Sequence, residues 1–146
     1  MGKPTIADAD LVLKLYELRT EELMRKARKY VAFDFWPETA AELMGMWTSF
    51  GSDGSAYLRQ VMSYWEMASS FVNHEALNED VFADSAGELF YLYAKYSPFI
   101  AEVREVNPGF LRNAEEYVNR SKENLERVDR LKNGAVKLAK TKAAGK

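Results

Sequence analysis

Apolar residues recur along most of the chain at intervals of three or four, the spacing of a helix that buries one face. The pattern predicts helices over about residues 8–34, 37–50, 55–73, 79–96 and 107–132. The alternation of two that marks a strand is missing throughout. The sequence therefore predicts an all-α fold, a single-domain array of five or six helices whose short loops make neighbours roughly antiparallel.

Proline and asparagine indicate where several of these helices begin or end. Asn78 is a good N-cap, because its side chain accepts hydrogen bonds from the free amides of a first turn. At Ser97-Pro98 we favour a break, since proline lacks an amide donor. Asn107-Pro108 has the form of an N-cap followed by a proline at the first helical position. The last helix also carries an alternating three-and-four stripe typical of a coiled-coil seam: Leu111, Ala114, Val118, Ser121, Leu125 and Val128.

Composition excludes several classes of protein and of site. With 146 residues and 47% apolar content the chain is a single globular domain, and no run of about 18 apolar residues predicts a membrane span. No leader pattern opens the chain, so we expect a cytoplasmic protein. Cysteine is absent and His74 is the one histidine, which excludes disulfides, zinc–thiolate sites and mechanisms that need two imidazoles. We expect no metal site and no cofactor.

Charge is distributed unevenly along the chain. The formal net charge is −2, yet no acidic residue follows Asp129, where six basic ones occur: Arg130, Lys132, Lys137, Lys140, Lys142 and Lys146. We therefore expect a helical domain over residues 1–132 and a basic, disordered tail over residues 133–146. Such a tail could tether the acidic body to a polyanion, although the lack of aromatic residues after Tyr117 disfavours nucleic acid.

Four charged residues do not fit the helices that carry them. Arg19 falls inside the apolar stripe of the first helix, where an unpaired charge is costly, so it needs a carboxylate. Glu66 and Glu88 are candidate partners, and Arg104 in its apolar stretch is a second cation. The four residues would form a neutral network that sets the helix register. Alternatively, an incompletely paired arginine would bind a small carboxylate or phosphate, with Tyr64, Tyr93 or Tyr96 donating a hydrogen bond.

Three aromatic residues are candidates for a partner surface. Trp36 and Trp47 flank the short helix over residues 37–50, and Tyr91 projects from the polar side of its helix. Exposed aromatic side chains of this kind are typical of interfaces between proteins.

Several motifs together resemble those of a known family. They are Leu15-Tyr16-Glu17-Leu18-Arg19, Ser63-Tyr64-Trp65-Glu66-Met67-Ala68, Gly87-Glu88 and the stretch from Pro98-Phe99 to Arg104. In this order they resemble an uncharacterised bacterial family of small all-helical proteins, a domain of unknown function, over about residues 8–117. The resemblance implies an all-helical bacterial cytoplasmic protein without an assigned activity. It also implies a shared role for Arg19, Glu66, Glu88 and Arg104, in folding or in binding.

No catalytic motif is present, so three hypotheses for the function are considered. The leading one is a non-enzymatic helical interaction module, a homodimer that pairs through its first or last helix or that binds another protein. The second is a small-anion binding or enzyme domain that uses Arg19, Glu66, Glu88 and Arg104. The third is attachment to a polyanion through the basic tail.

Overall fold

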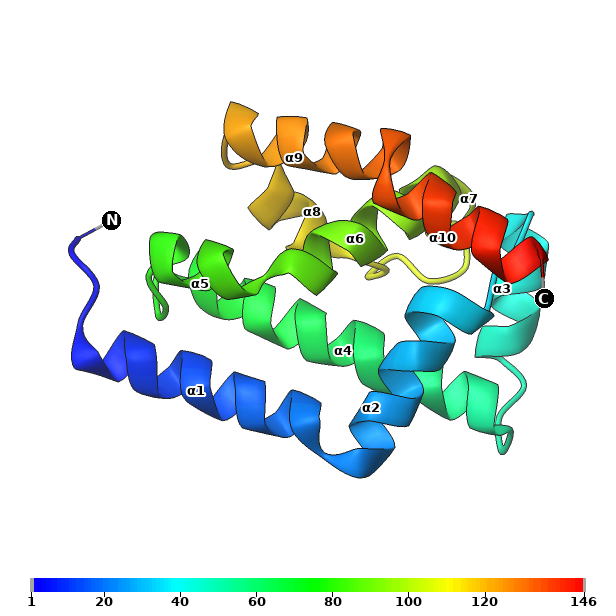
Figure 1. Cartoon of the computed structure of the whole chain (residues 1–146), viewed down its shortest axis with the longest axis horizontal. Helices are drawn as coiled ribbons and strands as arrows, with labels where there is room; N and C mark the ends of the chain where they lie inside the picture. Colours follow the sequence, from blue (N-terminus) through cyan, green and yellow to red (C-terminus); the bar gives the residue numbers. More distant parts are fainter. Residues whose placement is uncertain (1, 146) are drawn as a thin grey trace.

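The structure, a computed structural model, describes residues 2–145, and these residues contain helices and no strand (Figure 1). The α-helices are α1 (Ile6–Thr20), α2 (Glu22–Lys29), α3 (Ala40–Trp47), α4 (Asp53–Asn73), α5 (Glu79–Ser85), α6 (Gly87–Tyr96), α7 (Ile100–Val103), α8 (Arg112–Val118), α9 (Lys122–Asn133) and α10 (Ala135–Ala144). A π-helix, η1 (Tyr30–Asp34), and a 3₁₀-helix, η2 (Ser97–Phe99), complete the elements. The all-α class is confirmed, but the chain divides into more helices than the five or six expected.

The longest helix, α4, forms the centre of the core. It begins where the Ser52 hydroxyl accepts from the Ser55 amide, and α2, α3 and α8 pack around it. Figure 1 shows α4 running through the middle of the molecule, between α1 and α6. The predicted apolar face of this helix is confirmed by its buried residues: Ser55, Leu58, Val61, Met62, Tyr64, Trp65, Ala68, Ser69 and Val72.

The single helix expected over residues 8–34 is divided into α1, α2 and η1. Glu21 adopts an extended conformation and its carboxylate accepts from the amides of Leu23 and Met24, so it ends α1 and caps α2. The chain changes direction there, which lets α2 pack against α4 (Figure 1). Apolar spacing continued across the break because both helices bury one face, so periodicity alone could not detect it.

The helix expected over residues 107–132 is also divided. Its expected N-cap at Asn107 is wrong, because α8 begins only after Leu111, which has a left-handed φ of 53°. A second break follows α8, and the Ser121 hydroxyl caps α9 by accepting from the Asn124 amide. Four residues of the predicted coiled-coil seam are buried in the core of the chain itself: Leu111, Ala114, Val118 and Val128. This stripe is therefore not available for pairing with another molecule.

The signals at Asn78 and Pro98 are confirmed. The Asn78 side chain accepts from the amides of Asp80 and Val81 at the start of α5 and donates to the Gly2 carbonyl at 2.8 Å. Its own amide donates to the Asp8 carboxylate at 2.9 Å, which joins α1 to α5. Pro98 lies in η2, so α6 ends before it and the short α7 follows.

The end of the chain forms α10, where we expected a disordered tail. This helix contacts α6 and η1, with Val136 and Ala139 partly buried against the core. An alanine-rich sequence favours a helix, and these two side chains pack it against the core. Lys146, the last of the six basic residues, lies outside the described residues. Within residues 2–145, no helix combines the length and apolar character that crossing a membrane requires.

Replacing Asn78 by alanine is expected to lower the free energy of unfolding by about 1 kcal/mol, because α5 loses its N-terminal cap. Urea denaturation followed by circular dichroism measures this change. Asn133→Ala, at the exposed end of α9, is the matched control and is expected to change the free energy by less than about 0.5 kcal/mol. Equal losses in the two variants would contradict the assigned cap.

Candidate functional site

Glu88 lies at the junction of α2, α4 and α6, where it bonds two side chains. Its carboxylate accepts from Arg28 Nε at 2.7 Å and from Trp65 Nε1 at 3.1 Å, and its side chain is 13% exposed. Arg28 also donates from Nη1 to the Arg19 carbonyl at 3.2 Å. The partner of Glu88 is therefore Arg28, which sequence reasoning did not single out because we treated residues 8–34 as one straight helix.

Arg19 lies beside this pair without bonding to Glu88. Its guanidinium carbon is 5.2 Å from the centre of the Trp65 ring and 5.6 Å from that of Tyr16, within the range of cation–π attraction. Its Nη1 donates to the Ser85 carbonyl at 3.3 Å. The charge expected to need a carboxylate is stabilised instead by two aromatic faces and a carbonyl.

Tyr64 joins two helices at the same junction. Its hydroxyl donates to the Leu15 carbonyl in α1 at 2.6 Å. Burial raises the pKa of Tyr64 to about 12, so the hydroxyl keeps its proton at neutral pH. Because that proton is directed at a backbone carbonyl, Tyr64 connects α4 to α1.

Glu66 and Arg104 lie together around the start of α8. The Glu66 carboxylate accepts from the amides of Asn113 at 3.0 Å and Ala114 at 2.8 Å, in the first turn of that helix. It thus acts as a cap supplied by α4, where the helix dipole favours negative charge. Arg104 donates to the Phe110 carbonyl at 2.8 Å and to Glu115 at 3.1 Å.

The four charged residues therefore divide into two groups. Arg19 and Glu88 lie where α1, α2, α4 and α6 meet, whereas Glu66 and Arg104 hold the segment that leads into α8. Within residues 2–145, no hydrogen bond or ion pair links one group to the other.

The three aromatic residues expected at a partner surface have different environments. Tyr91 was expected to be exposed, but η1 and α10 cover its helix and it is buried, with its hydroxyl donating to the Ala32 carbonyl at 2.8 Å. Trp36 is half-buried and donates from Nε1 to the Phe33 carbonyl at 2.9 Å. Trp47 is half-buried and packs edge-on against Phe110, with ring centres 5.8 Å apart.

A buried lysine, Lys95 of α6, is a second residue, after Arg28, that sequence reasoning missed. It is only 6% exposed, and its ammonium group donates to the carbonyls of Val31 at 2.8 Å, Ala32 at 3.2 Å and Phe35. Its Nζ also lies 3.7 Å from the centre of the Trp36 ring. Two of the carbonyls belong to η1 and the third to Phe35, its C-cap residue, so they lie at a helix end where unpaired acceptors and the helix dipole both favour a cation. No local pattern around Lys95 indicates these distant acceptors.

Burial lowers the pKa of Lys95 from its ordinary value of 10.5 to about 7, against the opposing influence of the Asp34 carboxylate. The amine therefore titrates near neutral pH. When it loses a proton, two N–H groups remain for the three carbonyls that the ammonium contacts.

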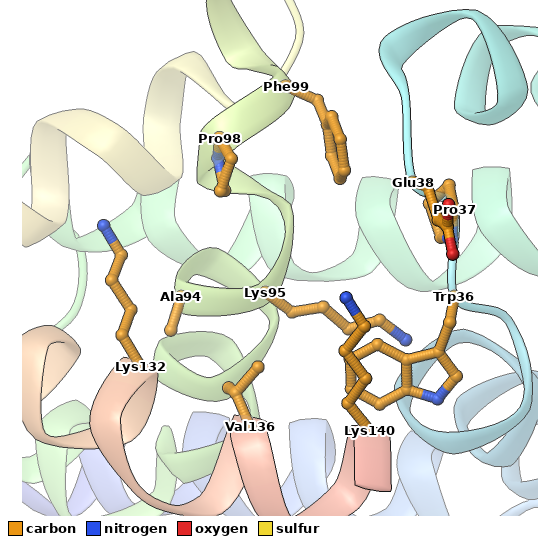
Figure 2. Close-up of a pocket in the computed structure, with 10 residues that line it drawn as sticks. All are labelled: Trp36, Pro37, Glu38, Ala94, Lys95, Pro98, Phe99, Lys132, Val136 and Lys140. Atoms are coloured by element: carbon orange, nitrogen blue, oxygen red, sulfur yellow. The ribbon is translucent and has the colours of Figure 1, made fainter. Parts of the chain in front are cut away.

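Lys95 lines a cleft of about 670 Å³. Its walls are formed by the end of α6 with η2, by the segment that follows η1, and by α9 together with α10. Figure 2 shows the Lys95 side chain between these walls, running toward Trp36. The lining combines lysines, one acid and apolar groups: Trp36, Pro37, Glu38, Ala94, Lys95, Pro98, Phe99, Lys132, Val136 and Lys140. Two of the basic residues near the end of the chain, Lys132 and Lys140, thus face a defined space.

Residues 4–121 match the family described as a domain of unknown function, DUF4760. The chain belongs to the DUF4760 family. This confirms the resemblance to an uncharacterised family and carries no assigned activity. No curated protein and no solved structure matches the chain. Helices α9 and α10 follow the part matched by DUF4760, so Lys132 and Lys140 contribute to the cleft from outside the family match.

Replacing Glu88 by alanine is expected to lower the free energy of unfolding by about 2 kcal/mol, because Arg28 and the Trp65 indole lose their acceptor in a largely buried place. Chemical denaturation measures this loss. Glu22→Ala removes a carboxylate from an exposed pair with Lys26 and is expected to cost less than about 0.5 kcal/mol. A loss at Glu88 no larger than at Glu22 would show that the Arg28 pair adds nothing to stability.

The lowered pKa of Lys95 predicts a pH-dependent stability. Between pH 7 and about pH 9 the unfolded chain binds this proton and the folded protein releases most of it, so the free energy of unfolding rises with pH; closer to pH 10 the raised pKa of tyrosines such as Tyr64 opposes this rise. The slope is expected to reach about 1.4 kcal/mol per pH unit and to vanish in Lys95→Met. Denaturant titrations at several pH values measure it. Lys26→Met, at an exposed lysine, should keep the wild-type slope; the same slope in Lys95→Met would refute the assignment.

Proposed function

We propose that the protein is a non-enzymatic interaction module that forms a homodimer through the outer face of α1. The observation that supports this proposal is the exposure of three large apolar side chains on one face of that helix: Ile6 at 81%, Leu13 at 59% and Tyr16 at 57%. The bacterial origin and cytoplasmic location implied by the family resemblance are part of the proposal.

The three side chains form one face. At about 100° per residue they fall within roughly 80° of one another, on the side of α1 opposite Leu15. Leu15 is the buried residue of this helix and packs into the core. A surface helix of a monomer normally directs polar residues outward, so an apolar outer face is typical of a helix that packs against a partner.

The charges beside this face are compatible with a second copy of the chain. Asp10 and Lys14 lie four residues apart on the same edge of the face. In an antiparallel pair with a twofold axis near Leu13, Asp10 of one protomer lies beside Lys14 of its partner, and the reverse contact follows by symmetry. The other interface considered is the helix predicted over residues 107–132. It is less suitable, because most of its apolar stripe is buried within the chain.

The alternative, a small-anion site formed by Arg19, Glu66, Glu88 and Arg104, has weaker support. In its favour, Arg19 Nε and Arg104 Nη2 are buried without a hydrogen bond among the described residues. Against it, Glu66 and Glu88 already accept two hydrogen bonds each from the protein. The four residues also belong to two separate groups, so they do not converge on one ligand.

Light scattering coupled to gel filtration tests the dimer. The wild-type protein is expected to show twice the mass of the chain at tens of micromolar, and Leu13→Glu is expected to show the monomer mass because it places two carboxylates at the twofold axis. The matched control is Val106→Glu, which adds a carboxylate at another exposed apolar residue and should leave the dimer intact. A monomer mass for the wild type up to about 200 µM, or dissociation caused equally by Val106→Glu, would overturn the proposal.

A further inference from the structure

We propose that the cleft beside Lys95 binds a small organic anion, one with a doubly negative group such as a phosphate on an apolar body the size of an aromatic ring. This site is separate from the outer face of α1 and does not depend on dimerisation. The charges of the cleft, its apolar walls and its size support the assignment independently.

The cleft gathers positive charge within an acidic protein. Three lysines, Lys95, Lys132 and Lys140, line it together with one acid, Glu38, whereas the formal net charge of the whole chain is −2. Within residues 2–145, neither Lys132 nor Lys140 forms an ion pair or a hydrogen bond through its side chain. Their charges are therefore free to act on a ligand. An anion placed between them gains attraction without breaking a contact in the protein.

Lys95 gives the site an amine in a fixed position, and its lowered pKa of about 7 leaves about half of these amines charged at pH 7. Its ammonium group is held by three carbonyls and the Trp36 ring, so binding an anion nearby requires no ordering of this side chain. Lys132 and Lys140 are exposed side chains on consecutive helices, and Figure 2 shows Lys140 extending toward Lys95 while Lys132 extends past Ala94. A bound anion would order these side chains.

The apolar walls explain why the ligand should carry a ring. Trp36 and Phe99 are both half-buried, and Figure 2 shows the Phe99 ring directed into the cleft from the wall opposite Val136. A flat apolar group between these walls would cover surface that water now reaches. The volume of about 670 Å³ lies within the range of small-molecule sites and exceeds what an inorganic ion fills.

Calorimetry and two-dimensional NMR of the full chain with three matched probes test the proposal. Phenyl phosphate combines the ring with the double charge, inorganic phosphate has the charge alone, and phenol has the ring alone. Phenyl phosphate is expected to bind at least about tenfold more tightly than either of the others and to shift the indole N–H signal of Trp36. The pH is kept at about 7, where the phosphate is mostly doubly charged and about half of Lys95 carries its proton.

Lysine variants locate the site. The double variant Lys132→Met, Lys140→Met is expected to weaken phenyl phosphate binding by about tenfold or more, because it removes both free cations of the cleft. The control is Lys137→Met, Lys142→Met, which removes the same charge from the same end of the chain at residues that do not line this cleft, and it should stay within about twofold of the wild type. Circular dichroism confirms that both variants keep α10.

Three results would overturn the proposal. The first is no phenyl phosphate binding at millimolar concentrations. The second is equal affinity for inorganic phosphate, which would mean that the apolar walls take no part. The third is an equal loss of phenyl phosphate affinity in the two double variants. It would mean that the anion is attracted by the total positive charge of the C-terminal helices and not by a site in this cleft. None of these results bears on the mass of the protein, so this proposal and the proposed dimer can fail separately.

Discussion

The end of η1 imposes the constraint on which much of this structure depends. A π-helix that stops inside a protein leaves carbonyl oxygens without amide partners, and buried carbonyls must find other donors. Helix α6 supplies them: Tyr96 donates to the Val31 carbonyl at 2.6 Å, Tyr91 donates to that of Ala32, and Lys95 contacts both. These donors have fixed positions along α6. They can therefore reach the carbonyls of η1 in only one relative position of the two helices. That position places Trp36 against Lys95 and thereby forms one side of the cleft.

The same principle recurs at other helix ends. The start of α8 is capped by Glu66 from α4, and the Phe110 carbonyl just before it accepts from Arg104. Asn78 caps its own helix while bonding both Asp8 and Gly2. The side chains of Glu66 and Asn78 each satisfy a helix terminus and also join segments that are distant in the sequence. The charged residues that first suggested a binding site make hydrogen bonds to helix ends and to side chains of neighbouring helices.

Two surfaces remain with side chains that the fold does not need. The outer face of α1 is apolar, and among the described residues Lys132 and Lys140 of the wall formed by α9 and α10 have no acidic partner. Helix α1 contacts α2 and α5, whereas α10 contacts α6, α9 and η1, and Figure 1 shows the two helices at different edges of the molecule. Pairing through α1 would therefore leave the cleft open. The proposed dimer face and the proposed ligand site would thus occupy separate surfaces, the second of them formed in part by helices that follow the DUF4760 match.

The sequence by itself determined those features that depend on neighbouring residues. The all-α class, the buried face of α4, the cap at Asn78 and the break at Pro98 follow from helical period, capping and proline chemistry. Only the tertiary structure decided which charges meet. Arg28 bonds Glu88 across 60 residues, and Lys95 bonds the carbonyl of Val31 across 64. It also decided the breaks at Glu21 and Leu111 and the docking of α10. Such contacts form because separate helices pack in one arrangement, and a periodic pattern shows which face of a helix is buried but not which helix covers it.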